Sequence, residues 1–264
     1  MRRLLRSVNA TLEAFGLDLR KTWRSLRGLP GYVRAHATLK RQAVLSGSVF
    51  PFGSSYPCLG EEFADSGFAQ GHYFQQDLCV ARRVRANQPV LHVDVGSRVD
   101  GFVAHVATFR EIVVFDIRPL SAEIANVRFA QVDLMASLPE EFLGYCDSLS
   151  SLHALEHFGL GRYGDPVDYE GHLRGLENLH RILKTGGTLY LSVPIGPQRI
   201  EFNAHRVFSV AYLLDHLTRD YRVARFSFVD DAAALHEDVL LSDADVTANF
   251  GCNYGCAIFE LTKL

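Results

Sequence analysis

The chain has 264 residues, of which 48% are hydrophobic, so it can bury a large core. Its five cysteines are odd in number and form no CxxC pair, and nothing at the start resembles a cleavable signal, so a reducing, cytoplasmic location is expected. No apolar run reaches the roughly 18 residues of a membrane-spanning helix.

Charge is distributed unevenly along the chain, although the net charge is only -3. Residues 1–41 hold ten basic and two acidic residues, a net charge of +8, and the remainder carries -11. Apolar side chains lie between the basic ones, as in segments that bind a membrane surface or an acidic partner. A helical extension packed on its own domain would have the same composition. The acidic remainder argues against nucleic acid as a partner.

From residue 89 onward, short apolar strands alternate with amphipathic helices. Strands are predicted at 89–96, 111–116, 127–133, 146–153, 188–194, 222–229 and 257–261, and helices at 101–110, 172–184 and 209–218. This alternation predicts a Rossmann-like, doubly wound α/β sheet of about seven strands, with ligands at the carboxyl ends of the strands. We expect a basic amphipathic arm over residues 1–41, a helical cap over 42–88 and the α/β domain over 89–264.

The first turn, DVGSRVDG, distinguishes between nucleotide-like cofactors. Gly96, Arg98 and Gly101 occupy the three positions of a G-x-G-x-x-G fingerprint. The middle position must be glycine where a pyrophosphate approaches the backbone, so Arg98 disfavours a dinucleotide and a nicotinamide-dependent oxidoreductase. S-adenosylmethionine contains no pyrophosphate and remains compatible with this turn.

Aspartates are predicted at the ends of the first three strands, at Asp94, Asp116 and Asp133. Asp116 is placed to accept hydrogen bonds from both ribose hydroxyls, each worth roughly 1.5 to 3 kcal/mol, and Asp133 to receive the adenine amino group. A single strand-end aspartate is often a structural cap, but three in register favour an S-adenosylmethionine site. The other expected cofactor contacts are Gly96, Ser97, Ile117, Leu134 and Tyr73.

Longer strings carry a family resemblance: GHYFQQD, HVDVGSRVDGFVAHVATF, FDIRPL, SLHALEHFGLGRYGDP and FNAHRVFS. Residues 89–192 resemble class I S-adenosylmethionine-dependent methyltransferases, and the strings are similar to an uncharacterised bacterial family associated with surface-polysaccharide biosynthesis, such as O-antigen or capsule. The first turn departs from the class because it lacks the second glycine.

The resemblance implies the class I methyltransferase fold and methyl transfer to a sugar or glycan acceptor. The basic arm would then contact the inner membrane peripherally or a glycosyltransferase. A non-catalytic scaffold of a glycan-assembly complex is the alternative.

The string His-Ala-Leu-Glu-His, residues 153–157, also matches a pattern of zinc peptidases. That site needs both histidines on one helix face. Because a glycine-rich stretch follows, we expect no such helix and no bound metal. In many methyltransferases a similar Leu-Glu-His follows the fourth strand, so the resemblance places Glu156 and His157 in the acceptor pocket; a structural role for His157 is the alternative.

Methyl transfer to a hydroxyl requires a base, and histidine suits this role near neutral pH. His153 and His205 are the candidates, and we favour His205 with His153 assisting, because Asn203 and Arg206 beside it could orient and bind an acceptor. The alternative is that this segment only caps the next helix. Arg162 could help to hold an acidic group of the acceptor.

Overall fold

The computed structural model describes residues 11–47, 50–64, 66–67 and 69–264. The chain divides into two compact units, Met1–Phe68 and Ala69–Leu264. The division therefore differs from the expected boundaries at residues 41 and 88. A single helix continues through residue 41, and the helix before residue 88 packs on the sheet of the second unit. Residues 1–10 of the expected arm lie outside the described residues.

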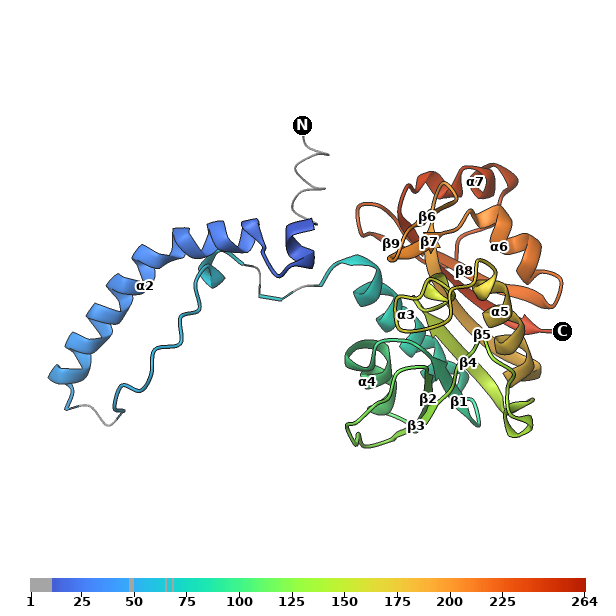
Figure 1. The fold of residues 1–264 in the computed structure, drawn as a ribbon, viewed down its shortest axis with the longest axis horizontal. Helices are drawn as coiled ribbons and strands as arrows, with labels where there is room; N and C mark the ends of the chain where they lie inside the picture. The colour runs from blue at the N-terminus through green and yellow to red at the C-terminus, as the bar shows by residue number, and fades with distance from the viewer. Residues whose placement is uncertain (1–10, 48–49, 65, 68) are drawn as a thin grey trace. The chain divides into compact units, whose positions relative to one another are not determined.

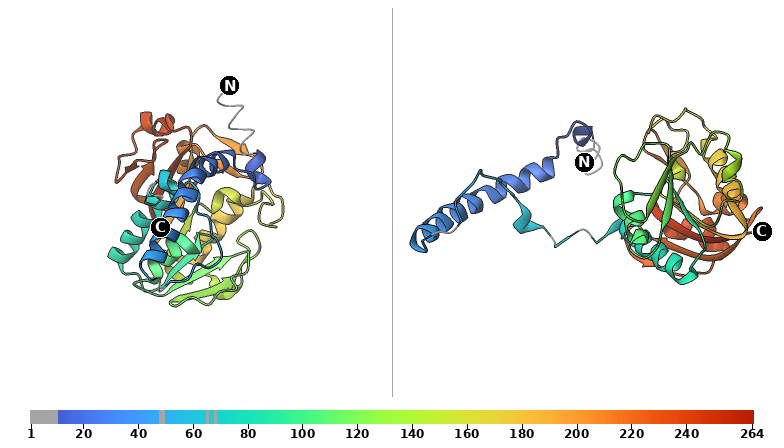
Figure 2. Two further views of the ribbon diagram at one scale, coloured as in Figure 1. Left: turned by 90° about the vertical axis from the view of Figure 1, so that its left-hand side faces the viewer. Right: turned by 90° about the horizontal axis from the view of Figure 1, so that it is seen from below.

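Helix α2 (Leu19–Leu45) is the main element of the first unit (Figure 1; Figure 2). It begins after Asp18, whose carboxylate accepts hydrogen bonds from the backbone N–H groups of Arg20 and Lys21. Its buried residue is Gly28, where a Cβ would lie 2.7 Å from the backbone nitrogen of Gly60. The short 3-10 helix η1 (Glu61–Phe63) follows that contact.

Within the described part of the chain, no helix is both long enough and apolar enough to cross a membrane.

The second unit is built on an eight-stranded sheet with strand order β3-β2-β1-β4-β5-β10-β8-β9. Strands β3, β2, β1, β4 and β5 are parallel, and β10 is antiparallel to both of its neighbours. The doubly wound sheet predicted from the sequence is confirmed. The strands are β1 (His92–Val95), β2 (Ile112–Asp116), β3 (Val127–Gln131), β4 (Cys146–Leu152), β5 (Leu183–Ile195), β8 (Tyr221–Val229), β9 (Leu235–His236) and β10 (Gly255–Lys263).

Helices cover both faces of this sheet (Figure 1). Alternate side chains of β2 show the division, because Ile112 and Val114 pack in the core under α3 whereas Val113 and Phe115 pack in the core with α5 and α6. Burial on both faces explains why the strands appear as continuous apolar runs. The remaining elements are α3 (Gly71–Asn87), η2 (Val99–Val103), α4 (Ala104–Ala107), η3 (Glu140–Phe142), η4 (Leu155–His157), α5 (Gly171–Ile182), the hairpin strands β6 (Arg199–Glu201) and β7 (His205–Val207), α6 (Val210–Leu217), α7 (Asp243–Thr247) and η5 (Asn249–Gly251).

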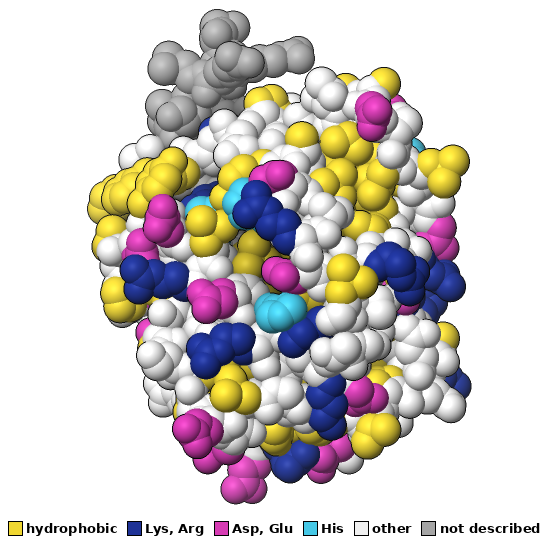
Figure 3. Space-filling view, turned by 90° about the vertical axis from the view of Figure 1, so that its right-hand side faces the viewer, with side chains coloured by type: hydrophobic (Ala, Val, Ile, Leu, Met, Phe, Trp, Pro, Cys, Tyr) yellow, Lys and Arg dark blue, Asp and Glu magenta, His cyan; other side chains and the backbone are white. Residues whose placement is uncertain are grey.

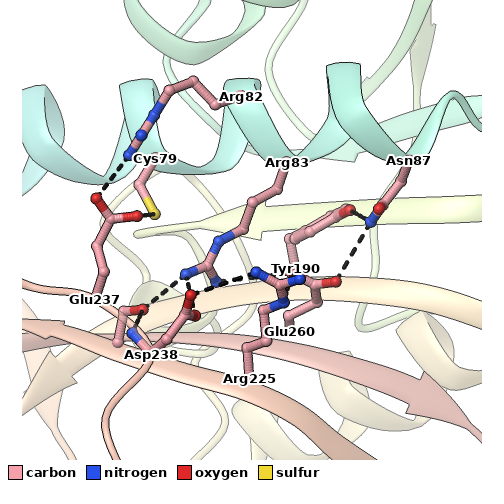
Figure 4. A network of polar contacts seen from close by, with 10 residues as sticks. Cys79, Arg82, Arg83, Asn87, Tyr190, Arg225, Glu237, Asp238 and Glu260 are labelled. Atoms are coloured by element: carbon pink, nitrogen blue, oxygen red, sulfur yellow. Dashed lines mark hydrogen bonds and ion pairs between the residues drawn. The ribbon is translucent and has the colours of Figure 1, made fainter.

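Helix α3 is fixed to the sheet by polar contacts (Figure 4). The buried Arg83 donates hydrogen bonds to Ser227 and Asp238 at 2.8 and 2.9 Å, and its other terminal nitrogen lies 3.7 Å from Glu260. One turn further along α3, Asn87 donates a hydrogen bond to the hydroxyl of Tyr190. Rather than capping the sheet edge, as expected for residues 42–88, α3 covers a face of the sheet.

On the face of the second unit shown in Figure 3, basic and acidic side chains are interspersed. This distribution contrasts with α2, which contains seven basic residues and no acidic one.

Candidate functional site

A pocket of about 260 Å³ opens at the carboxyl ends of β1 to β4 in the second unit. Parallel strands bring residues that are distant in sequence to one sheet edge, which is where doubly wound folds bind ligands. Nine predicted site residues form part of the pocket wall: Tyr73, Gly96, Asp116, Ile117, Asp133, Leu134, His153, His157 and Arg162.

The first turn lies against the segment that follows β4. Gly96 has a φ of +70°, and a Cβ there would lie 2.9 Å from the Cβ of Ala154. Gly101 leaves room for a buried carboxylate of α3, because its Cβ would lie 2.5 Å from Oδ2 of Asp77. Both glycines thus permit close approach of neighbouring groups, and Arg98 between them forms part of the pocket wall.

Asp94 and Ser97 stabilise this turn from inside the protein. Asp94 lies within β1, fully buried, and its carboxyl accepts hydrogen bonds from the Ser97 N–H and hydroxyl at 3.0 and 2.6 Å and from the Ser150 hydroxyl at 2.5 Å. Burial raises the pKa of Asp94 to about 7. The predicted cofactor contacts of Asp94 and Ser97 are corrected, because both lie behind the pocket wall.

Asp116 ends β2 and reaches the pocket, as its predicted role requires. Its carboxylate accepts hydrogen bonds from the backbone N–H and the guanidinium of Arg118 at 2.8 to 3.1 Å. The same guanidinium lies 4.4 Å from the centre of the Tyr163 ring. Sequence reasoning missed both residues. Arg118 is two positions after Asp116 and could have been noticed, whereas nothing in the glycine-rich loop indicated Tyr163.

Asp133 and Leu134 lie just beyond β3 and also form part of the pocket wall. Oδ1 of Asp133 accepts a hydrogen bond from the backbone N–H of Met135 at 2.8 Å, which holds the turn after the strand. Leu134 is buried and Ile117 follows Asp116, so apolar side chains flank the carboxylates. This combination suits a ligand with a flat, partly apolar ring and hydroxyl groups.

His153 and Glu156 form a buried pair directly after β4. Nδ1 of His153 lies 2.6 Å from Oε1 of Glu156, and their side chains are 3% and 1% exposed. Burial by itself would lower the pKa of His153, but the Cys256 and Glu156 side chains raise it well above its usual value. His153 lines the pocket and Glu156 supports it from behind, so the predicted acceptor contact of Glu156 is corrected.

His157 has a fixed orientation in the pocket wall. Its Nδ1–H donates to the carbonyl oxygen of Ala204 at 2.7 Å, and Arg162 donates to the same oxygen at 3.0 Å. Burial lowers the pKa of His157, so its imidazole is neutral near pH 7 with Nε2 unprotonated. This is the state that a general base requires.

His205, Asn203 and Arg206 do not form part of the pocket wall, and their predicted roles stay predictions. Residues 199–207 fold into the β6–β7 hairpin, in which Nε2 of His205 faces Glu201 at 3.2 Å and Asn203 occupies the turn with a φ of +59°. Arg206 is buried and donates to the carbonyl oxygens of Phe158 and Tyr169, so its guanidinium stabilises the loop between these two residues. Short hairpins of this kind leave little trace in a sequence.

The peptidase-like pattern does not form its helix. Leu155–His157 is a single 3-10 turn, and His153 has a φ of +53° before it. The two histidines therefore do not share a helical face, and the peptidase interpretation is wrong.

Comparisons with known proteins concern the fold and a central segment of the chain. Residues 118–236 match a family described as "Caenorhabditis protein of unknown function, DUF268". Comparison with curated proteins gives no match.

Solved structures share the architecture. The chain is 17% identical to the [4+2]-cyclase SpnF, with a TM-score of 0.50 over 75% of this chain and 85% of that one. It is 14% identical to 1,6-didemethyltoxoflavin-N1-methyltransferase of Burkholderia thailandensis, crystallised with S-adenosylhomocysteine, with a TM-score of 0.51 over 71% and 78% of the two chains. Together with the strand order, these similarities show that the chain has the Rossmann-like fold of class I methyltransferases.

Proposed function

We propose that the protein binds S-adenosylmethionine in the pocket and transfers its methyl group to an acceptor. The observation that carries this proposal is the position of Gly96, directly after β1, and of Asp116, at the end of β2, because the two strands are paired at Val95 and Phe115. Gly96 forms part of the pocket wall where the methionine part of the cofactor would lie, and Asp116 offers acceptors for ribose hydroxyls. The residues present therefore fit this cofactor.

When bound, S-adenosylmethionine would supply a methyl group on a positively charged sulfur, ready for direct displacement. The protein must then position the acceptor and accept its proton. His157 suits the second task, because it forms part of the pocket wall and Ala204 holds its Nδ1–H, while its Nε2 lies 3.8 Å from Oε1 of Glu156. We assign the base to His157 in place of His205.

The proposed acceptor is a sugar hydroxyl of a surface glycan or its precursor, in line with the family resemblance. Arg162, Tyr163 and Asp165 give one side of the pocket both charge and an aromatic surface, which sugars with acidic groups require. Methyl transfer must itself be tested, because SpnF, which shares the fold, is a cyclase.

Calorimetry with S-adenosylmethionine tests the cofactor site. We expect Asp116→Asn to bind about 10- to 100-fold more weakly, because charge-assisted hydrogen bonds are lost. Asp100→Asn is the matched control, since Asp100 is an exposed carboxylate on the first turn outside the pocket wall. Equal affinity of both variants would remove Asp116 from the site. Transfer of labelled methyl groups to protein or small amines but not to glycans would contradict the proposed acceptor.

A further inference from the structure

Three potential metal ligands from distant segments converge beside the pocket. His72 lies in the first turn of α3, His153 follows β4 and Cys256 lies in β10. One ligand atom from each of the three side chains lies within 4.8 Å of the other two. The group belongs to the second unit, and only His153 is shared with the peptidase-like pattern.

The free nitrogen of His153 independently indicates a ligand. Among the described residues, Nε2 of His153 has no hydrogen-bond partner, although the side chain is only 3% exposed. An unpaired buried nitrogen is costly, by roughly 1 to 3 kcal/mol. The positive φ of His153 adds backbone strain of a kind that is concentrated at functional sites.

Glu156 orients His153 for metal binding. With Nδ1–H donated to the Glu156 carboxylate at 2.6 Å, the ring of His153 turns Nε2 away from that carboxylate, and a metal ion would displace any proton from Nε2. A carboxylate behind a ligating histidine is the usual supporting arrangement in metal sites. Cys256 is fully buried and forms no disulfide, and its thiol donates to Oε1 of Gln76 at 3.5 Å. His72 is half-buried, with its ring stacked on that of His153 at 5.2 Å.

We propose that His72, His153 and Cys256 bind a zinc-like divalent ion through two nitrogens and one sulfur. Tetrahedral zinc places such atoms about 3.3 to 3.6 Å apart, so atoms now up to 4.8 Å apart need to approach by up to about 1.2 to 1.5 Å. Binding converts the Cys256 thiol to a thiolate and displaces any proton on the ligating nitrogen of His153, and these protons are released to solvent. Three protein ligands leave a fourth position for water or an acceptor atom. This site goes beyond the proposed function and does not depend on it.

The test uses chelator-treated full-length protein titrated with zinc chloride or cobalt chloride alone. We expect one equivalent of metal to bind, with release of at least one proton and, for cobalt, a thiolate charge-transfer absorption. Cys256→Ser should abolish that absorption, and Glu156→Gln should weaken binding about 10- to 100-fold. Cys252→Ser is the matched control, because this neighbouring buried cysteine lies outside the group and should leave binding unchanged.

His72→Gln decides the question if Cys256→Ser fails to fold, because His72 is less buried than the other two ligands. It should also weaken zinc binding by at least about 10-fold. Absence of stoichiometric binding by the unmodified protein, or equal binding by His72→Gln, would overturn the proposal. Calorimetry with S-adenosylmethionine on metal-free protein separates this outcome from failure of the proposed function.

Discussion

At the scale of single residues, the buried Asp94 behind the pocket makes the free energy of unfolding depend on pH. Its pKa rises from an ordinary value of 3.8 to about 7 because it is buried. Between about pH 4 and 7 the folded state therefore binds more protons at Asp94 than the unfolded state. The contribution of Asp94 to stability is full below about pH 4 and is lost as pH rises through 7.

We expect Asp94→Asn to destabilise the protein more at pH 5 than at pH 8, measured by urea unfolding. Asp147→Asn is the control. Burial opposes ionisation of Asp147, but the N–H groups of Leu91 and Val90 hold its pKa below the usual value, so its effect should be the same at both pH values. A pH-independent cost of Asp94→Asn would show that Asp94 is already ionised at pH 5.

His157 is tested as the base by turnover. His157→Gln should lose about 10² to 10⁴ in kcat while binding of S-adenosylmethionine stays nearly unchanged. His205→Gln is the matched control, because its ring lies in the β6–β7 hairpin outside the pocket wall. A comparable loss in His205→Gln alone would return the role to His205.

At the scale of elements, the attachment of α3 to the sheet depends on the buried guanidinium of Arg83. The side chain of Arg83 is 9% exposed and connects α3 to β8 and β10. Arg83→Met should lower the free energy of unfolding by roughly 2 to 4 kcal/mol, because it leaves the carboxylates of Glu260 and Asp238 without their cation. The cost stays within this range because Asp238 is partly solvated.

Arg82→Met provides the comparison on the same helix. Arg82 pairs with Glu237 at 2.8 Å, but the two side chains are 63% and 42% exposed, so its loss should cost less than about 1 kcal/mol. Urea unfolding measures both variants. Similar costs would mean that packing along α3, and not the Arg83 network, holds the helix.

The sequence predicted elements better than side-chain directions. Strand ends such as Asp116 were located because buried parallel strands have continuous apolar runs and end abruptly. Asp94 shows the limit of this reasoning. It lies one residue before the end of β1, and its carboxylate is buried inside the protein rather than exposed in the pocket. Cys256 and His72 lie near His153 only because β10 and α3 take particular places in the tertiary fold, and local sequence patterns do not specify those places.

At the scale of the whole molecule, the first unit differs chemically from the second. Helix α2 contains seven basic and no acidic residues, and Trp23 and Leu26 on it are exposed. We propose that this unit binds anionic membranes peripherally, with each basic residue near the surface contributing up to about 1 kcal/mol.

Sedimentation with liposomes tests this proposal. The full chain should bind vesicles that contain phosphatidylserine at low salt and dissociate at high salt, whereas neutral vesicles should not bind it. A fragment of residues 69–264 should lose vesicle binding and keep its affinity for S-adenosylmethionine. A fragment that fails to fold would indicate that the first unit is a structural extension.

Strand β10 follows every other strand of the sheet in sequence but lies between β5 and β8. During synthesis, β5 and β8 therefore leave the ribosome with one edge unpaired each. The sheet stays incomplete until β10 inserts between them. Cys256 arrives on the same strand, so the proposed metal group is also completed last. Nascent chains stalled before residue 255 should require chaperones to stay soluble, and metal loading should follow translation.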